Sequence, residues 1–254
     1  MIRFVGTSFD ETIGELGEAI EACRRAKHRA GYFAALYWRT TKAVRARAEA
    51  GQFEDRDRME RFASTFAERY LTAYRAWQTD KPMTASWKLA FDTASLRRPI
   101  VLQHLVFGMS AHINLDLGIV AAELSRGEPG GLASLRSDFD HINSVLSDEL
   151  DGSQACVDRV SPFIRLADGV GLRSDEAIGR FTLRIARQGA WDSAEQLSKC
   201  AAADWDSAVA RRDHAVAAFA AGLRHPGGLL GLAMAVVRIG EFHSVPHVID
   251  ALSS

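Results

Sequence analysis

The chain has 254 residues, of which 47% are hydrophobic and 25% are charged. That length and composition suit a globular protein that can bury a substantial core. The 31 basic and 32 acidic residues give a net charge of −1 and are spread along the chain. We therefore expect neither nucleic acid nor an anionic membrane as a partner.

The cysteines, Cys23, Cys156 and Cys200, are far apart and show no Cys-x-x-Cys spacing. This pattern supports neither a disulfide framework nor a zinc knuckle and is typical of a reducing cytoplasm. Residues 1–16 have no apolar signal region, and we expect no segment with the roughly 18 charge-free apolar residues of a membrane span. We predict a cytoplasmic protein.

Few prolines and many Ala, Leu, Arg and Glu residues predict helix along nearly the whole chain. Ser8 and Glu11 have capping-box spacing and predict a first helix that ends near residue 28. A second helix is expected over about 31–50, and Asp55 should cap a third helix through Trp77. After a break at Lys81-Pro82, helix resumes from residue 84.

The second half begins with an apolar helix predicted over about 99–126, with Pro99 in its first turn. Further helices are expected over about 135–150 and 153–166, with Pro162 bending or splitting the latter. A long helix over 174–199 and another from Asp204 to about residue 224 complete the series. Because we find no linker or repeat, we predict one all-α domain over 1–254.

The segment "RPIVLQHLVFGMSAHINLDLGIVAAEL", residues 98–124, is apolar enough for a central core helix, yet it carries several polar side chains. In a helix, His104, His112 and Asp116 share one side, and His112 and Asp116 are i, i+4 neighbours. A helix that is apolar nearly all round is normally buried, so these groups need partners. A second polar side contains Gln103, Ser110 and Asn114.

Two interpretations of these residues stay open. One is a structural hydrogen-bond network in which His112 pairs with Asp116. The other is a pocket in which His104, His112, Asp116 and Asp138 bind a divalent metal, either Fe, Zn or Mn. Asp138 joins this set because it points with the core face of the helix at 135–150, where a carboxylate needs a cation, a metal or donors. Its alternative role is a carboxylate favoured by a helix N-terminus.

Arg187 lies on an apolar sector of the predicted helix at 174–199. We expect it either to neutralise Asp116 or Asp138, or to hold a substrate carboxylate or phosphate in a bidentate grip. Ser110 is not expected to be a nucleophile, because no strand precedes it and its motif lacks the second glycine. His243 and His247 are poor candidates for metal ligands, because Pro246 lies between them.

The segment "QHLVFGMSAHINLDL", residues 103–117, resembles the signature block of an uncharacterised family, the domain of unknown function 5995, whose usual form reads HxxxGMNAHINxDL. Ser110 stands where that block has Asn. The pieces "FAALYWRTTKAV" at 33–44, "DFDHINSVL" at 138–146 and "RQGAW" at 187–191 fit the same pattern. The resemblance implies an all-helical domain and carries no established reaction. It marks as signature positions His104, His112, Asn114, Asp116, Asp138 and Arg187.

Three hypotheses about function follow. The first is a metal-dependent hydrolase or non-haem iron oxidase that acts on a small molecule, in which Asn114 and Arg187 orient the substrate. The second is a metal-free isomerase, cyclase or lyase that uses His112 and Asp116 for acid/base chemistry on an apolar small molecule. The third is a non-enzymatic ligand-binding or interaction domain. The apolar segment 228–237 either caps the core or forms a homodimer interface.

Overall fold

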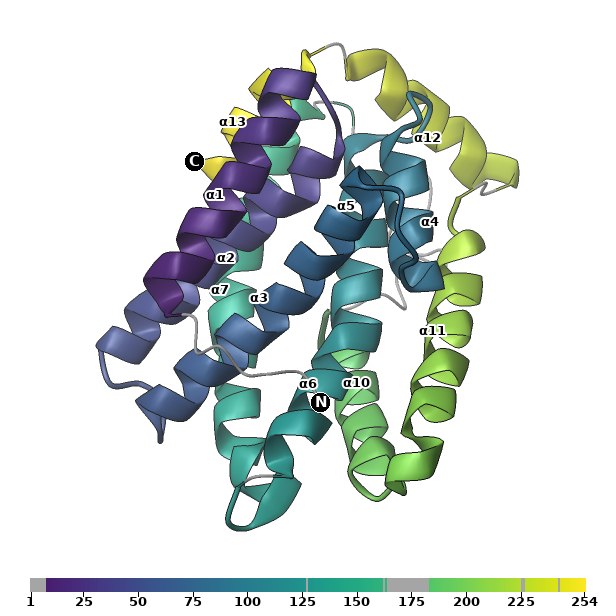
Figure 1. The fold of residues 1–254 in the computed structure, drawn as a ribbon. Coiled ribbons are helices and arrows are strands. Elements are labelled where there is room, and N and C mark those ends of the chain that lie inside the picture. The colour runs from purple at the N-terminus through teal and green to yellow at the C-terminus, as the bar shows by residue number, and fades with distance from the viewer. Residues whose placement is uncertain (1–7, 127, 162, 164–182, 225–226, 242) are drawn as a thin grey trace.

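The computed structural model describes residues 8–126, 128–161, 163, 183–224, 227–241 and 243–254. These residues form helices and no strand, which confirms the predicted all-α class. Figure 1 shows long helices packed around a central run that consists of α5 (Val101–Met109), η1 (Ser110–Asp116) and α6 (Leu117–Ser125). The helix α12 (Gly228–Gly240) lies across one end of the molecule.

Three long helices from the first third of the chain build one side: α1 (Phe9–Ala26), α2 (Ala30–Glu49) and α3 (Arg56–Gln78). The predicted capping box of α1 is confirmed, since Ser8 and Glu11 each accept a backbone N–H from the other. The predicted cap of α3 is also confirmed, since the Asp55 carboxylate accepts the backbone N–H of Arg58 over 2.9 Å. The short helix α4 (Ala85–Ala94) then packs against α5.

The central run differs from the single α-helix that we predicted. Its middle part, η1, is π-helical, and the N–H of Leu117 donates to the carbonyl of His112, five residues earlier. Such a wide turn displaces backbone carbonyls from the α-helical ladder. Arg212 of α11 (Trp205–Ala221) supplies one replacement donor, because its Nε donates to the carbonyl of Asn114 over 2.9 Å. Short π-helical insertions of this kind occur frequently at functional sites.

One helix after the central run, α7, is longer than predicted. A 3₁₀ turn, η2 (Gly131–Leu135), leads into α7 (Arg136–Val160), which replaces the two helices predicted over 135–150 and 153–166. Gly152 does not break α7, because the roughly 1 kcal/mol cost of a helical glycine is smaller than the gain from burying side chains on both sides of it, such as Val145 and Val157. Pro162 lies outside the described residues.

The last described helices are α10 (Leu183–Ser198), η3 (Ala202–Asp204), α11, α12 and α13 (Val245–Ser253). The beginning of the helix predicted over 174–199 lies outside the described residues. α10 packs against α6, and α11 packs against α4 and η1. These contacts place the π-helical turn at the centre of the described part of the domain.

One run of residues meets the length and composition of a membrane span, although we predicted none. It is the central run, Val101–Ser125, and 89% of its most apolar window is buried inside the protein. A core helix of this kind meets the same criterion, so the finding is weak support for a membrane span.

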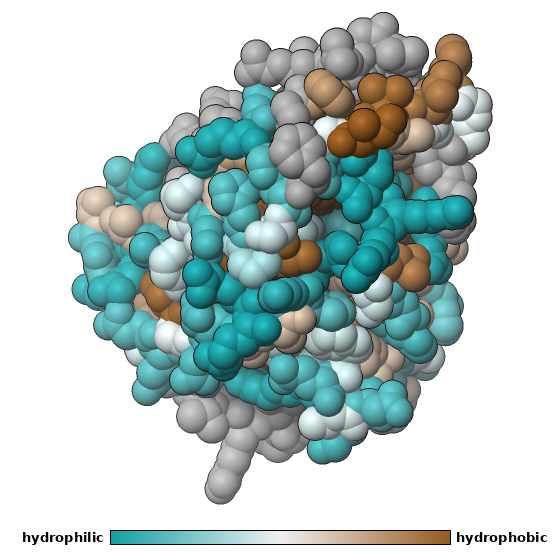
Figure 2. Space-filling view, turned by 90° about the horizontal axis from the view of Figure 1, so that it is seen from above, coloured by the Kyte–Doolittle hydropathy of each residue, from teal (hydrophilic) through white to brown (hydrophobic). Residues whose placement is uncertain are grey.

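The apolar segment 228–237 forms most of α12, and its two faces differ. The inner face, with Ala233, Met234 and Val237, is buried against Ile100. The outer face forms an apolar patch, brown in Figure 2, that contains Leu229, Leu232, Val236 and Ile239. The inner face of α12 therefore covers part of the core, as one of the two predictions states. The other prediction, a homodimer interface, stays a prediction.

Candidate active site

An apolar cavity of about 100 Å³ lies between α2, α3 and the central run, with α7 and α10 closing it. Most of its wall is aromatic or aliphatic, and Phe33, Tyr37 and Phe66 contribute rings to it. Two strongly polar side chains also line it, the imidazole of His112 and the guanidinium of Arg187.

His112 is 2% exposed, and aromatic rings hold it on several sides. Its ring stacks on Phe66 with a centroid distance of 3.5 Å and an interplanar angle of 6°. Tyr37 meets it edge-on at 4.4 Å, and Phe33 at 5.7 Å. Gly108, one turn earlier, makes room for this packing, because a Cβ atom there would lie 2.5 Å from the Phe33 ring.

Asp116 supports the inner edge of this imidazole. Its Oδ2 atom lies 3.4 Å from Nδ1 of His112, at the long end of hydrogen-bond distances. The same oxygen accepts the indole N–H of Trp87 over 2.8 Å, and Oδ1 accepts Nε of Arg69 over 2.8 Å. Residues from α3 and α4 therefore hold the carboxylate in place behind His112.

The charges of this pair follow from burial and contacts. Burial raises the pKa of Asp116, but His112 and Arg69 outweigh it and hold that pKa below its ordinary value, so the carboxylate is ionised. Burial lowers the pKa of His112 by more than Asp116 raises it, so the imidazole is neutral at pH 7. With its hydrogen on Nδ1, facing the carboxylate, the ring leaves a lone pair on Nε2. That nitrogen has no hydrogen-bond partner within the described parts of the chain.

Arg187 reaches the same cavity from α10 and is 3% exposed. Its Nη2 donates to the carbonyl of Phe139 over 2.8 Å, and its guanidinium lies 4.5 Å from the centre of the Phe139 ring. Burial lowers the pKa of Arg187 to about 9, so the side chain stays positively charged at neutral pH. The structure thus places Arg187 and His112 at one cavity. This arrangement is a condition for the predicted role of Arg187 in holding a substrate carboxylate or phosphate.

Asn114 was predicted to orient the substrate, but it is not part of the cavity wall. Its side chain donates to the Ser110 hydroxyl over 3.2 Å, and its carbonyl accepts from Arg212. Because Asn114 follows His112 by two residues, it lies on a different side of the central run: its backbone carbonyl faces α11, while His112 faces α2 and α3. Asn114 therefore contributes to helix packing and does not face the cavity.

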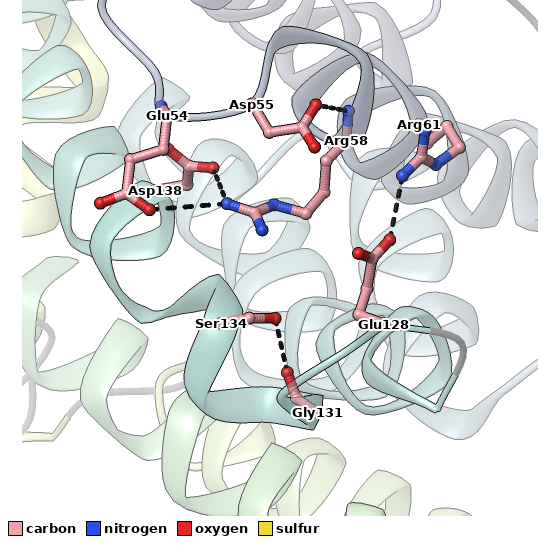
Figure 3. Close-up of polar contacts among 8 residues, drawn as sticks. All are labelled: Glu54, Asp55, Arg58, Arg61, Glu128, Gly131, Ser134 and Asp138. Atoms are coloured by element: carbon pink, nitrogen blue, oxygen red, sulfur yellow. Dashed lines mark hydrogen bonds and ion pairs between the residues drawn. The ribbon is translucent and has the colours of Figure 1, made fainter.

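Asp138 lies at the start of α7, where it contacts Arg58 and Glu54 (Figure 3). Its Oδ2 atom accepts Nη2 of Arg58 over 2.6 Å, and its Oδ1 atom accepts the backbone N–H of Glu54 over 2.8 Å. We expected Asp138 to complement the side of His112 and Asp116. Instead, this carboxylate joins the beginning of α7 to the beginning of α3, because a buried arginine is available there.

Of the four predicted metal ligands, His112 and Asp116 lie next to each other, whereas His104 and Asp138 make their contacts elsewhere. His104 lines a second cavity with Arg29 and Tyr32, while both oxygens of Asp116 and of Asp138 already accept hydrogen bonds. Among the described residues, no group of three or more His, Cys, Asp or Glu could hold a metal ion. The predicted donor set therefore does not fit a metal ion as these side chains are arranged.

The comparisons with known proteins identify the family. A family model described as "Family of unknown function (DUF5995)" matches residues 9–226. The chain belongs to the DUF5995 family. No curated protein and no solved structure matches the chain. The match includes the whole DUF5995 cavity wall, while α12 and α13 lie beyond it.

Sequence reasoning missed three side chains that complete the polar contacts of this DUF5995 chain: Arg58, Arg69 and Trp87. Arg69 had a usable signal, because it follows Phe66 by three residues and precedes Ala73 by four, on the buried face of α3. Trp87 is a buried core residue, and its indole N–H therefore needs an acceptor. Arg58 follows its own N-cap residue by three positions, and nothing in the sequence marks it as buried.

Proposed function

We propose that this DUF5995 protein is an enzyme that binds a small, mainly apolar molecule in the cavity and uses His112 to transfer a proton on it. The reaction class is that of a metal-free isomerase, cyclase or lyase. One observation carries the proposal: a buried imidazole is held on one edge by a carboxylate, has no described partner on the other edge, and lines an apolar cavity.

The proton transfer uses groups that are already in place. The Nε2 lone pair of neutral His112 accepts a proton from an acidic C–H or O–H of the bound molecule. The imidazolium that forms is stabilised through Nδ1–H by the Asp116 carboxylate, and the apolar surroundings strengthen this attraction. Arg69 and Trp87 keep the carboxylate in position throughout. Returning the proton to a different atom of the same molecule completes an isomerisation and restores the neutral ring.

Arg187 gives the cavity a positive charge near the reacting group. As the substrate loses a proton, negative charge builds up on it, typically on a carbonyl oxygen. A guanidinium held at the cavity wall stabilises that charge without any need for solvent to reorganise. The same cation attracts a carboxylate on the substrate.

The cavity limits the size and polarity of the molecule. A dry apolar cavity of roughly 150 Å³ is known to hold benzene, and the volume of about 100 Å³ found here is of the same order. We therefore propose a substrate with one ring or a short branched chain and a single polar group. Apolar walls also exclude water, which protects a carbanion-like intermediate from solvent.

Two other functions were predicted from the sequence. Metal-dependent hydrolysis or oxidation receives less support from the geometry, because each carboxylate of the predicted set is engaged by an arginine. A ligand-binding domain without catalysis would use the same cavity and would bind the molecule without making or breaking a bond.

A cytoplasmic location likewise stays a prediction.

Deuterium exchange separates catalysis from binding alone. The full chain is incubated in D₂O with cyclohexanone, acetophenone and phenylacetate, and the incorporation of deuterium is followed by mass spectrometry. We expect faster exchange for at least one probe, and a loss of about 100-fold or more in His112→Gln. His214→Gln, on the exposed face of α11, is the matched control and should keep the full rate.

The two negative outcomes have different meanings. Probes that raise the melting temperature without any exchange would identify a binding domain and reject the enzyme. Exchange that persists in His112→Gln would reject the proposed base. Metal content measured on the same samples tests the metal hypothesis directly, since near-stoichiometric Fe, Zn or Mn that disappears in His112→Gln would favour it over ours.

A further inference from the structure

A second cavity, of about 30 Å³, lies where the first residues of α2 meet α5 and the junction between α12 and α13. Its wall is far more polar than that of the first cavity. It includes Arg29, Tyr32, His104, Arg238 and Glu241. No residue of the His112 cavity takes part in it, so the two sites are independent.

His104 is the buried group of this cavity that lacks partners. It is 6% exposed, and neither of its ring nitrogens makes a hydrogen bond of good geometry with a described residue. Burial and the nearby charge of Arg29 lower its pKa to about 3, although the Pro99 carbonyl acts in the opposite direction. The ring is therefore neutral and offers one N–H donor. Buried polar atoms without partners are uncommon and generally indicate a missing water or ligand.

Positive charge gathers around this ring. The guanidinium of Arg29 forms no hydrogen bond or ion pair with any residue in the described ranges, and burial together with the neighbouring charges of Arg238 and Arg97 lowers its pKa. Arg238 is held in place, because Nε and Nη1 donate to the carbonyls of Arg97 and Glu241 over 3.0 and 2.7 Å. Like charges this close repel each other unless an anion lies between them.

Glu241 does not neutralise the arginines fully, because its carboxylate is used elsewhere. Both of its oxygens lie 3.1 Å from the backbone nitrogen of Val101, at the start of α5, and Oε1 also accepts the Ser161 hydroxyl. This arrangement caps α5 with a negative charge, which favours the helix N-terminus. The net charge of the wall stays positive, with two guanidinium groups against one carboxylate.

We propose that this cavity binds an oxyanion group, a phosphate or a carboxylate, between Arg29, His104 and Arg238. Guanidinium groups provide the planar donors that such groups prefer, the imidazole adds one N–H, and the Tyr32 hydroxyl completes the wall. The volume admits only the anionic group, so the rest of a larger molecule stays outside. Two sources share this chemistry: a soluble phosphate compound, or a lipid headgroup, since α12 carries both Arg238 and the exposed apolar patch.

Calorimetric titration of the full chain with inorganic phosphate and with acetate tests the soluble source. Sedimentation with phosphatidylcholine vesicles that contain or lack phosphatidic acid tests the lipid source. We expect Arg29→Gln to weaken binding at least tenfold. This variant should keep the fold, because Arg29 is only partly buried and provides no side-chain cap to α2. Arg25→Gln, at the exposed end of α1, is the matched control and should bind like the unchanged chain.

Nuclear magnetic resonance adds a readout at the site itself. Phosphate should shift the imidazole signals of His104 and leave those of His214 unchanged. Phosphate binding alone assigns a soluble ligand, and binding that requires phosphatidic acid assigns a lipid headgroup. Absence of binding in both arms, or equal binding by Arg29→Gln and the unchanged chain, would overturn the proposal and leave only water in the cavity.

Discussion

Arg69 and Asp116 lie 47 residues apart in the sequence and meet through a 2.8 Å contact between Nε and Oδ1. The carboxylate is 1% exposed and the arginine side chain 21% exposed, so the pair lies at the boundary of the core. A buried carboxylate without such a partner would become protonated or unfold its surroundings. Arg69 is thus the reason that a charged group can stand behind His112.

Asp116→Asn should lower the free energy of unfolding by about 2–4 kcal/mol, because it leaves Arg69 without its anion in a partly buried position. Arg69→Met should have a similar effect. In the double variant we expect a loss smaller than the sum of the two, with a coupling of about 1–3 kcal/mol. Urea unfolding of the four proteins measures this, and additive losses would contradict the pair.

Asp138→Asn separates structure from chemistry. Because Asp138 binds Arg58 and the Glu54 backbone, and not His112, its loss should destabilise the fold by about 2–4 kcal/mol. The rate of deuterium exchange into the probe should be unchanged in folded Asp138→Asn, whereas this exchange should be lost in Asp116→Asn. The comparison is made by mass spectrometry at a temperature where both variants are folded. Equal loss of exchange in both would place Asp138 in the catalytic site after all.

Gly108→Ala tests the packing of the imidazole. The new methyl group would meet the Phe33 ring at 2.5–2.7 Å, so we expect the free energy of unfolding to fall by about 1–3 kcal/mol and binding in the cavity to weaken. Gly14→Ala is the control, because nothing lies within 4 Å of that position in α1. It should raise the stability by about 0.5–1 kcal/mol. Thermal unfolding compares the two, and a stabilised Gly108→Ala would show that Phe33 moves freely.

The stability should depend on pH through two buried histidines. Burial lowers the pKa of His112, and burial with Arg29 lowers that of His104 from 6.5 to about 3, so both rings bind protons more readily in the unfolded chain. Their contribution is full above pH 6.5 and is lost as the pH falls towards the folded pKa values. Below about pH 6, we expect the protonation of His104 alone to lower the free energy of unfolding by about 1.4 kcal/mol for each pH unit.

Urea unfolding at pH 7, 6 and 5 in a buffer without phosphate measures this dependence. The slope should be smaller in His104→Gln than in the unchanged chain. An identical slope in both proteins would mean that His104 is not buried as described.

The sequence by itself determined the helical class and several helix ends. Ser8, Glu11 and Asp55 act within one helical turn, so their caps can be read from spacing alone. The sequence also located His112 and Asp116, because polar residues inside an apolar segment of this length stand out against their neighbours. The i, i+4 pairing of these two residues is a local relationship, and the structure has it at 3.4 Å.

Only the tertiary structure decided the partners of these groups. Arg69, Trp87 and Arg58 reach their carboxylates from other helices, and no local pattern encodes which helices become neighbours. The π-helical turn also escaped prediction, and one of its carbonyls, that of Asn114, accepts a hydrogen bond from Arg212 of α11, 98 residues away. Asn114 lies outside the cavity wall because it is on another side of the helix than His112, as the polar pattern of the sequence indicates. The site is therefore a product of helix packing, because long-range hydrogen bonds from other helices supply the partners of its polar side chains.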